Sequence, residues 1–190
     1  MINFDNAATS GRKPASVINA VNRALTRYSA NPGRGGHELS LRAGEAVFDA
    51  REKISGYFGA SGGEHVIFTA NCTAAVNYVL KGYLKDGDHV IISDLEHNAV
   101  MRPLKKTGVQ KSVAAVSFYD DYTTVENFEK LIKDNTKMIF CTAASNVCGR
   151  VLPLKKIGDL CRTRGIAFGV DAAQAAGVIP IDMVDRLTEG

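Results

Sequence analysis

Short apolar runs rich in β-branched residues alternate with amphipathic stretches along most of the chain, and this alternation limits the possible fold more than any other feature. The apolar runs predict strands at residues 65–69, 89–93, 112–118, 138–143 and 166–170. The stretches between them predict helices at 73–83, 98–106, 125–133 and 154–164. Strands that alternate with helices form parallel sheets covered on both faces. We therefore predict an α/β fold with a three-layer, parallel-rich sheet flanked by helices.

Two more helices are predicted ahead of the first strand, at residues 14–28 and 39–58, joined by the glycine-rich loop 31–37. We accordingly divide the chain into an N-terminal helical segment, 1–60, and a larger domain, 61–190. The sequence stops where another strand and helix would be expected, and a sheet that ended there would leave an unpaired edge strand. We expect the larger domain to be incomplete at its C-terminus.

The charge pattern argues against polyanionic partners. Lys and Arg number 23 and Asp and Glu number 20, which leaves a net charge of +3 from residues that are scattered along the chain. No basic stripe or cluster favours nucleic acid or a membrane surface. The sequence also lacks the run of about 18 apolar residues that a membrane-spanning helix needs.

The four cysteines (72, 141, 148 and 161) show no C-x-x-C spacing and lie in or beside apolar segments. That arrangement favours reduced thiols over disulfides and predicts no metal site. With no secretory signal visible at the start, we expect a cytoplasmic protein.

Ligands of open parallel sheets bind beyond the carboxyl ends of the strands, so the residues directly after each apolar run are the candidates. The first such turn, 69–73, is small and polar and opens directly onto a helix. Its backbone N–H groups and the positive end of the helix dipole suit a phosphate, and Thr73 adds a hydroxyl. The alternative is that Asn or Thr in this turn caps the helix.

Two further strand ends carry groups that could contact a ligand. His97 follows the second predicted strand, where an imidazole can act as acid or base or stack on an aromatic ring. Asn146 follows the fourth and can both donate and accept hydrogen bonds. The alternatives are an exposed loop histidine and an ordinary turn asparagine.

Asp171 is the strongest candidate because it directly follows the buried run 166–170. An ionised carboxylate there is costly to desolvate unless a cation or several donors compensate it. A protonated heterocyclic nitrogen would do so, and Gln174 could reach a neighbouring oxygen of the same ring. An Asp that caps a following helix is the alternative. Together with the phosphate turn, the histidine and the amides, these residues form the set that pyridoxal 5′-phosphate needs.

Six segments, in order along the chain, resemble those of the class V aminotransferase group, specifically the cysteine desulfurases. The segments are 3–9 (NFDNAAT), 31–40 (NPGRGGHELS), 68–69 (FT), 96–98 (EHN), 145–147 (SNV) and 170–174 (VDAAQ). The resemblance implies the aspartate-aminotransferase-like architecture, called fold type I, of the enzymes that depend on pyridoxal phosphate. It also implies a homodimer when the protein is complete.

The resemblance assigns a role to each candidate around the cofactor. It implies that His97 stacks on the pyridine ring and shuttles protons, while Asp171 pairs with the ring nitrogen. Gln174 would contact the phenolic oxygen, and the Cys72 backbone and Thr73 would hold the phosphate. His97 is thus the catalytic candidate among the cofactor-binding residues.

The remaining roles implied by the resemblance concern the substrate. Asn146 would lie near the substrate carboxylate or the ring oxygen. Ala7, Ala8 and Arg34 match segments that approach the substrate or the dimer partner in relatives. Cys72 and Cys148 depart from the pattern, because relatives more often carry Ala and Thr there.

The larger departure is an absence from the sequence. The family binds its cofactor covalently through a lysine in a Ser/Thr-x-His-Lys-like segment, and it uses a later cysteine to accept sulfur; neither is matched here. The resemblance therefore implies the N-terminal part of a cysteine desulfurase, which turns L-cysteine into L-alanine and passes sulfur to an acceptor protein. We expect this chain to be inactive alone.

Three alternatives remain open on the sequence. The complete protein could be a selenocysteine lyase or another class V aminotransferase, because the motifs define the cofactor better than the substrate. The chain could instead be a non-catalytic module that binds pyridoxal phosphate, or half of a split enzyme. An unrelated nucleotide-binding α/β protein is the third alternative.

Overall fold

The structure, a computed structural model, describes residues 10–34, 36–105 and 107–183. The chain forms two compact units. The first contains the described residues up to Ile67 together with 181–183, and the second contains the described residues of 68–180.

The first unit consists mainly of two helices, α1 (Ala15–Arg27) and α2 (Glu38–Tyr57). The loop between them is held to α2 by Ser40, whose hydroxyl donates to the carbonyl of Asn31 at 2.7 Å. His37 caps α2 by accepting a hydrogen bond from the Ser40 N–H, which satisfies one of the amides left open at a helix start. The two predicted helices are confirmed to within one residue at each end.

The predicted strand at 65–69 is wrong. Gly63–His65 forms a 3₁₀ turn (η1), and residues 66–69 form no strand. A strand needs a neighbour for its backbone N–H and C=O groups, and no strand of the described residues pairs with this segment. Ile67 and Phe68, the residues that suggested a buried strand, are 83% and 53% exposed.

The second unit contains a four-stranded parallel sheet in the order β2-β1-β3-β4, which confirms the predicted fold class. The strands are β1 (His89–Ser93), β2 (Gln110–Ala114), β3 (Thr136–Thr142) and β4 (Ala167–Asp171). Strand β2 ends four residues earlier than predicted, because the N–H of Val116 donates to the Asp94 side chain instead of to another strand.

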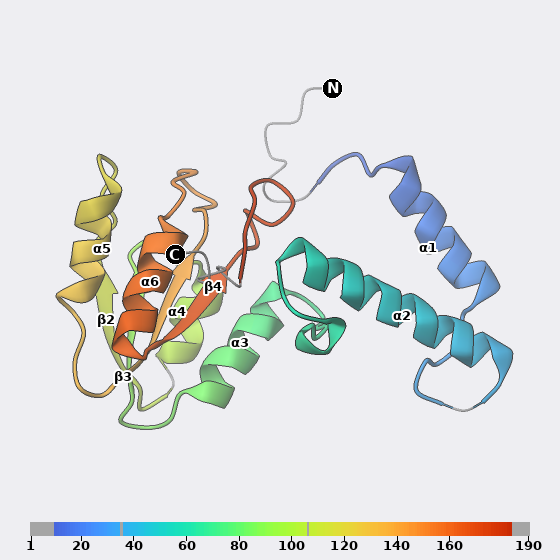
Figure 1. The fold of residues 1–190 in the computed structure, drawn as a ribbon, viewed down its shortest axis with the longest axis horizontal. Coiled ribbons are helices and arrows are strands. Elements are labelled where there is room, and N and C mark those ends of the chain that lie inside the picture. The colour runs from blue at the N-terminus through green and yellow to red at the C-terminus, as the bar shows by residue number, and fades with distance from the viewer. Residues whose placement is uncertain (1–9, 35, 106, 184–190) are drawn as a thin grey trace. The chain divides into compact units, whose positions relative to one another are not determined.

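Helices cover both faces of this sheet (Figure 1). Side chains alternate along the central strand β1, so that Val90 and Ile92 face one layer and Ile91 the other. The first layer is α3 (Cys72–Tyr83) and α4 (Asn98–Leu104), and the second is α5 (Asp121–Glu129) and α6 (Leu154–Arg164). The central strands β1 and β3 are largely buried on both faces, as expected of a parallel sheet, whereas the edge strands β2 and β4 are more exposed.

Capping residues set the helix ends more sharply than the apolar pattern does. Helix α5 begins four residues earlier than predicted because Asp120 accepts a hydrogen bond from the Thr123 N–H at 2.6 Å. Helix α6 ends as predicted at Arg164, where Gly165 takes up a left-handed conformation (φ +63°) that a glycine adopts without strain.

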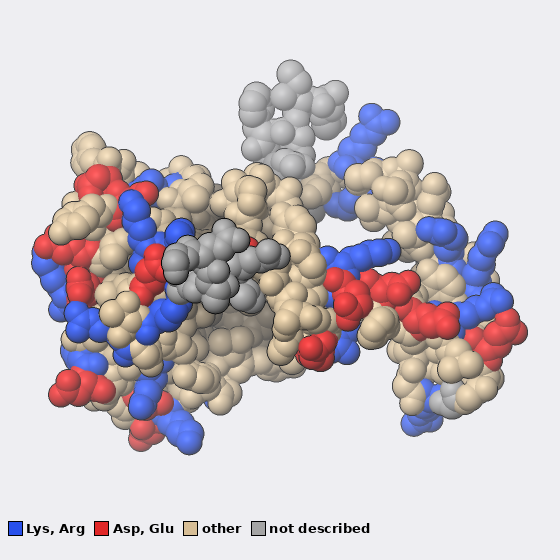
Figure 2. Space-filling view, viewed as in Figure 1, with Lys and Arg blue, Asp and Glu red and all other residues tan. Residues whose placement is uncertain are grey.

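The surface charges and the helices were compared with what a charged partner or a membrane would require. On the face shown in Figure 2, basic and acidic side chains are interspersed over the molecule. Among the described helices, none has the length and apolar character that crossing a bilayer would require.

His89 joins three strands at the end of the sheet where the strands begin. Its ring is fully buried, with Nδ1 at 2.8 Å from Thr136 Oγ1 on β3 and Nε2 at 2.9 Å from Ser112 Oγ on β2. Burial lowers the pKa of His89, and the nearby positive charge of Lys133 lowers it further. His89 is therefore neutral in the folded protein near neutral pH.

This neutral histidine predicts a loss of stability in acid. Because the folded-state pKa lies below the ordinary value of 6.5, the unfolded chain binds a proton that the folded chain excludes. His89 therefore makes its full contribution above about pH 6.5, and the contribution falls as the pH drops toward the folded-state pKa. Urea unfolding of the wild type and His89→Gln should show a stability difference that shrinks between pH 7.5 and 5.

The exposed His65 provides the control, because its side chain is 58% accessible. The stability difference between the wild type and His65→Gln should not follow the pH profile of His89→Gln. A difference between wild type and His89→Gln that does not change with pH would contradict the account of His89.

Candidate functional site

The turn before α3 is both a helix cap and a cluster of open amides. Asn71 caps the helix by accepting a hydrogen bond from the Ala74 N–H at 2.9 Å, so the capping alternative for this turn is correct. Among the described residues, no partner is recorded for the N–H groups of Cys72 and Thr73. A cap of this kind leaves two amides at the positive end of a twelve-residue helix, and such amides suit an anion.

Asp171 ends strand β4 and is only 6% exposed. Its Oδ1 accepts hydrogen bonds from the Ala173 N–H at 3.0 Å and from the Cys72 thiol, whose Sγ lies 3.4 Å away. Its carbonyl accepts a hydrogen bond from the Ala143 N–H at 2.8 Å. The thiol contact brings the start of α3 directly against the end of β4, 99 residues later in the chain.

Glu96 is a second acidic group at the same edge of the sheet. Its Oε1 accepts hydrogen bonds from the Ser93 hydroxyl and from the Thr142 N–H, the latter at 2.8 Å. Thr142 lies opposite Asp171 in the register of β3 and β4. The hydrogen bond from Thr142 therefore holds Glu96 at the end of β3, next to the strand that carries Asp171. Its Oε2 is buried and has no hydrogen-bond partner among the described residues.

The environment of Glu96 keeps a proton on it near neutrality. Burial is the largest cause, and together with the negative charge of Asp171 it raises the pKa of Glu96 to about 7, although the hydrogen bonds from Ser93 and Thr142 oppose the rise. A protonated Oε2 can donate a hydrogen bond, which gives the unpartnered atom a function once a ligand is present.

His97 lies next to Glu96 and caps helix α4. Its Nδ1 accepts a hydrogen bond from the Ala99 N–H at 3.1 Å, so the neutral ring carries its hydrogen on Nε2. The residue is exposed, and the cap fixes the orientation of its ring. His97 thus has a structural role and still presents an accessible ring at the edge that holds Asp171.

Asn146 and Gln174 lie in turns that follow β3 and β4. Asn146 is exposed at the tip of a turn that is closed by a hydrogen bond from the Gly149 N–H to the Ser145 carbonyl at 2.9 Å. Gln174 is partly buried in the turn that begins after Asp171. Among the described residues, no recorded contact joins the Asn146 side chain to Asp171.

The three substrate candidates fall outside this cluster. Ala7 and Ala8 lie outside the described residues. Arg34 belongs to the first unit, is exposed, and its carbonyl accepts a hydrogen bond from the Ser40 hydroxyl at 3.2 Å. The structure therefore joins Cys72 to Asp171 by a hydrogen bond, and it joins Glu96 to Thr142, the register partner of Asp171. Thr73 and His97 are the chain neighbours of Cys72 and Glu96.

Sequence reasoning missed Glu96 as a site residue. Part of the signal was present, because Glu96 lies three residues after the fully buried strand β1, whereas Asp171 is itself the last residue of β4. Ser93 and Thr142, which bind Glu96, are also buried polar residues at strand ends, with exposures of 1% and 6%.

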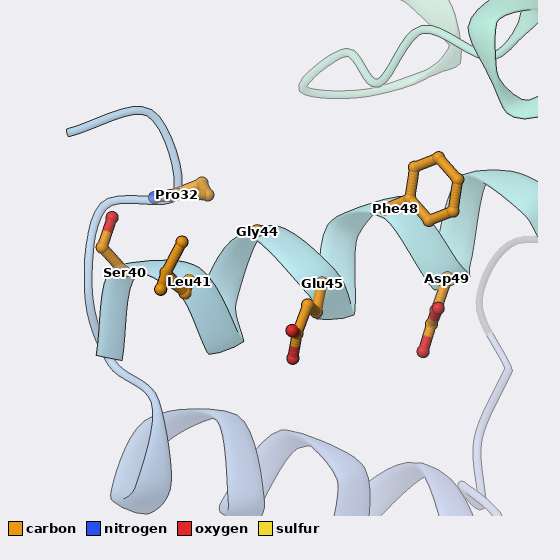
Figure 3. Close-up of a pocket in the computed structure, with 7 residues that line it drawn as sticks. All are labelled: Pro32, Ser40, Leu41, Gly44, Glu45, Phe48 and Asp49. Carbon is orange, nitrogen blue, oxygen red and sulfur yellow. The ribbon is translucent and has the colours of Figure 1, made fainter. Parts of the chain in front are cut away.

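A separate pocket lies on helix α2 of the first unit (Figure 3). It is lined by Pro32, Ser40, Leu41, Gly44, Glu45, Phe48 and Asp49. Two of these residues are carboxylates, which repel a phosphate, and the lining includes none of the candidate site residues.

The cluster in the second unit fits a ligand with a cationic ring and a phosphate. The buried carboxylate of Asp171 needs a compensating positive charge, and the open amides of Cys72 and Thr73 suit a negative one. The unpartnered Oε2 of Glu96 supplies a further polar contact. The chemistry of these residues therefore fits the charged groups of pyridoxal phosphate.

Comparison with known proteins points the same way. The model of the family "Aminotransferase class-V" matches residues 2–186. A probable cysteine desulfurase of Halalkalibacterium halodurans is 35% identical over 96% of this chain and 47% of its own length. The apo structure of a cysteine desulfurase from Thermococcus onnurineus NA1 matches with a TM-score of 0.83 and 28% identity, over 94% of this chain and 46% of that one.

A third similar protein, SspA, was solved in complex with cysteine. It matches with a TM-score of 0.84 and 26% identity, over 96% of this chain and 53% of that one. The chain thus spans about half the length of these similar proteins.

Because the folded chain holds a proton on Glu96, we predict that the contribution of Glu96 to stability falls as the pH rises, whereas that of His89 falls as the pH drops. Between pH 4.5 and about 7 the folded chain keeps a proton on Glu96 that the unfolded chain has lost. The contribution of Glu96 to the free energy of unfolding is therefore largest below pH 4.5 and falls as the pH rises to about 7. Glu96→Gln, which carries no titrating proton, should gain stability relative to the wild type across this window in urea unfolding.

The matched control is Glu126→Gln, because Glu126 is a half-buried glutamate on α5 that is paired with Lys130. Its stability difference from the wild type should not follow the Glu96 profile. A flat pH profile for the difference between wild type and Glu96→Gln would rule out the buried proton.

Proposed function

The chain belongs to the class-V aminotransferase family, and on this basis we propose that it is the cofactor-binding part of a pyridoxal-phosphate-dependent cysteine desulfurase. Similar proteins carry that name, and one was solved with cysteine bound. The observation that carries the proposal is the contact between Cys72 and Asp171, which joins an anion-binding helix start to a buried carboxylate. One phosphorylated cationic ring would satisfy both.

The cofactor of this family is pyridoxal phosphate, and we assign its contacts as follows. Asp171 would pair with the protonated ring nitrogen, and the amides of Cys72 and Thr73, with the Thr73 hydroxyl, would hold the phosphate. His97 would stack on the ring and Gln174 would contact the ring oxygen. The bound cofactor supplies an electron-withdrawing ring that stabilises negative charge developing on the substrate.

Asp171 is suited to its proposed task because its burial makes a cationic partner favourable. An unpaired buried carboxylate is costly to keep ionised, and a cation at Oδ2 would remove that cost. Charge-assisted hydrogen bonds of this kind contribute about 1.5–3 kcal/mol each. The pair would keep the ring nitrogen protonated.

Glu96 limits the negative charge beside Asp171. With its pKa raised to about 7, mainly by burial, Glu96 stays protonated in mildly acidic solution, so the edge then carries one carboxylate charge and not two. The protonated acid can donate from Oε2 while Oε1 keeps its hydrogen bonds from Ser93 and Thr142. We propose that Glu96 orients the strand ends around Asp171.

The finer parts of the assignment extend to the whole protein. None of the four histidines is followed by lysine, so this sequence contains no Ser/Thr-x-His-Lys segment. We propose that residues 61–190 form the cofactor-binding domain, and that the lysine and the sulfur-accepting cysteine lie outside this chain, which alone would be inactive. In the complete protein we propose a homodimer that converts L-cysteine to L-alanine and delivers sulfur to an acceptor protein.

The test is reversible binding of pyridoxal phosphate to the 190-residue chain, followed by equilibrium dialysis. We expect Asp171→Asn to weaken binding about 10- to 100-fold, the equivalent of one charge-assisted hydrogen bond. His97→Ala should also weaken binding, because the stacking ring is lost. Borohydride treatment of the complex should attach no cofactor to any lysine of this chain.

The matched control is Asp159→Asn, since Asp159 is a half-buried carboxylate on α6 that is paired with Arg162. Its affinity for pyridoxal phosphate should equal that of the wild type. Equal affinity of Asp171→Asn and wild type would contradict the assignment of Asp171. Covalent trapping on a lysine of this chain would contradict the proposal that the cofactor-binding lysine lies outside it.

A further inference from the structure

Cys72 contacts Asp171, the carboxylate that we propose pairs with the cofactor ring. Its Sγ lies 3.4 Å from Asp171 Oδ1, at the first residue of α3. We propose that Cys72 is a positioning residue, whose thiol donates a hydrogen bond to Oδ1 and holds the Asp171 carboxylate with Oδ2 directed to the ring nitrogen. This inference rests on the proposed function for the identity of the ligand, and on the structure alone for the contact.

The hydrogen bonds at Asp171 fall on one oxygen. Oδ1 accepts from both the Cys72 thiol and the Ala173 N–H, the latter at 3.0 Å. No donor among the described residues is recorded on Oδ2. Two donors on Oδ1 fix the plane of the carboxylate, so Oδ2 is the oxygen that can accept from a ligand.

A thiol at the start of a helix is normally acidic, because the helix dipole and open amides stabilise the thiolate. Cys72 behaves differently. Although the residue as a whole is exposed, partial desolvation of its thiol raises the pKa of Cys72 to about 11, and both the negative charge of Asp171 and the hydrogen bond to it contribute to the rise. The proton therefore stays on sulfur at neutral pH, and a thiol must keep its proton in order to donate.

Cys148 supplies an internal comparison. It is also exposed on the chain surface, in the turn after β3, but hydrogen bonding by Ser145 and Arg150 lowers the pKa of its thiol. The two exposed thiols of the second unit should therefore react at different pH values. Cys141 and Cys161 are buried and do not compete for reagents.

The first test is alkylation of the native chain by iodoacetamide between pH 7 and 11, measured for each cysteine by peptide mass spectrometry. We expect Cys148 to react at lower pH than Cys72, whose rate should rise only toward pH 11. Asp171→Asn keeps the shape of the side chain and removes its charge. This variant should increase the Cys72 rate at pH 8.5 about tenfold, because each unit by which the pKa falls gives tenfold more thiolate.

The pH range separates Cys72 from the other acidic group beside Asp171. Glu96, with its pKa near 7, is already ionised at pH 8.5 and contributes a constant charge. The Cys148 profile should be the same in Asp171→Asn and wild type. The contact is disproved if Cys72 reacts like an ordinary exposed thiol in the wild type, or if Asp171→Asn leaves its profile unchanged.

A second measurement does not depend on how Asp171→Asn folds. The infrared S–H stretch of the wild-type chain should include a band moved to lower frequency by a hydrogen bond to a carboxylate, and this band should be missing from Cys72→Ala. If every S–H band of the wild type persists in Cys72→Ala, the thiol does not donate to Asp171.

The final test uses pyridoxal phosphate and the pair Cys72→Ser and Cys72→Ala. Serine retains a donor and should bind the cofactor within about twofold of the wild type, whereas alanine should weaken binding several-fold. Equal affinities of Cys72→Ala and wild type would overturn the positioning role. A wild-type chain that shows the alkylation behaviour but binds no pyridoxal phosphate would overturn the proposed function and leave the thiol contact intact.

Discussion

The candidate site depends on a buried carboxylate at the end of a parallel strand. Asp171 is 6% exposed, and its surroundings offer a thiol and one amide as donors but no recorded cation among the described residues. A carboxylate in that position is stable only when neighbouring groups or a ligand compensate its charge. The other site features, from the start of α3 to the protonated Glu96, are arranged around this requirement.

The sheet brings these groups together because its strands are parallel. All four strands end at the same edge, so groups 46 residues apart, such as Glu96 and Thr142, become hydrogen-bonded neighbours. The strands begin at the opposite edge, where the buried His89 joins three of them. Its surroundings lower the pKa of His89, whereas those of Glu96 raise the pKa of Glu96. The polar network at the edge where the strands begin is therefore structural, and the one at the edge where they end is suited to a ligand.

The sequence was sufficient for β1, β3 and β4 because each contains an apolar run between helices, and for the place of Asp171 at a strand end because a charge after such a run is conspicuous. It was not sufficient where structure depends on partners far along the chain. Residues 65–69 have the composition of a strand but no pairing neighbour in the described chain. Glu96 looked like an ordinary loop residue, because its bond to Thr142 requires knowing that β1 and β3 are adjacent.

The most direct measurement is a crystal structure of this chain with pyridoxal phosphate. The account predicts the phosphate at the amides of Cys72 and Thr73, and the ring nitrogen within hydrogen-bond distance of Asp171 Oδ2. A cofactor bound elsewhere, for example in the pocket on α2, with the Asp171 carboxylate still hydrogen-bonded to Cys72 and Ala173 and not to the ring, would contradict this assignment.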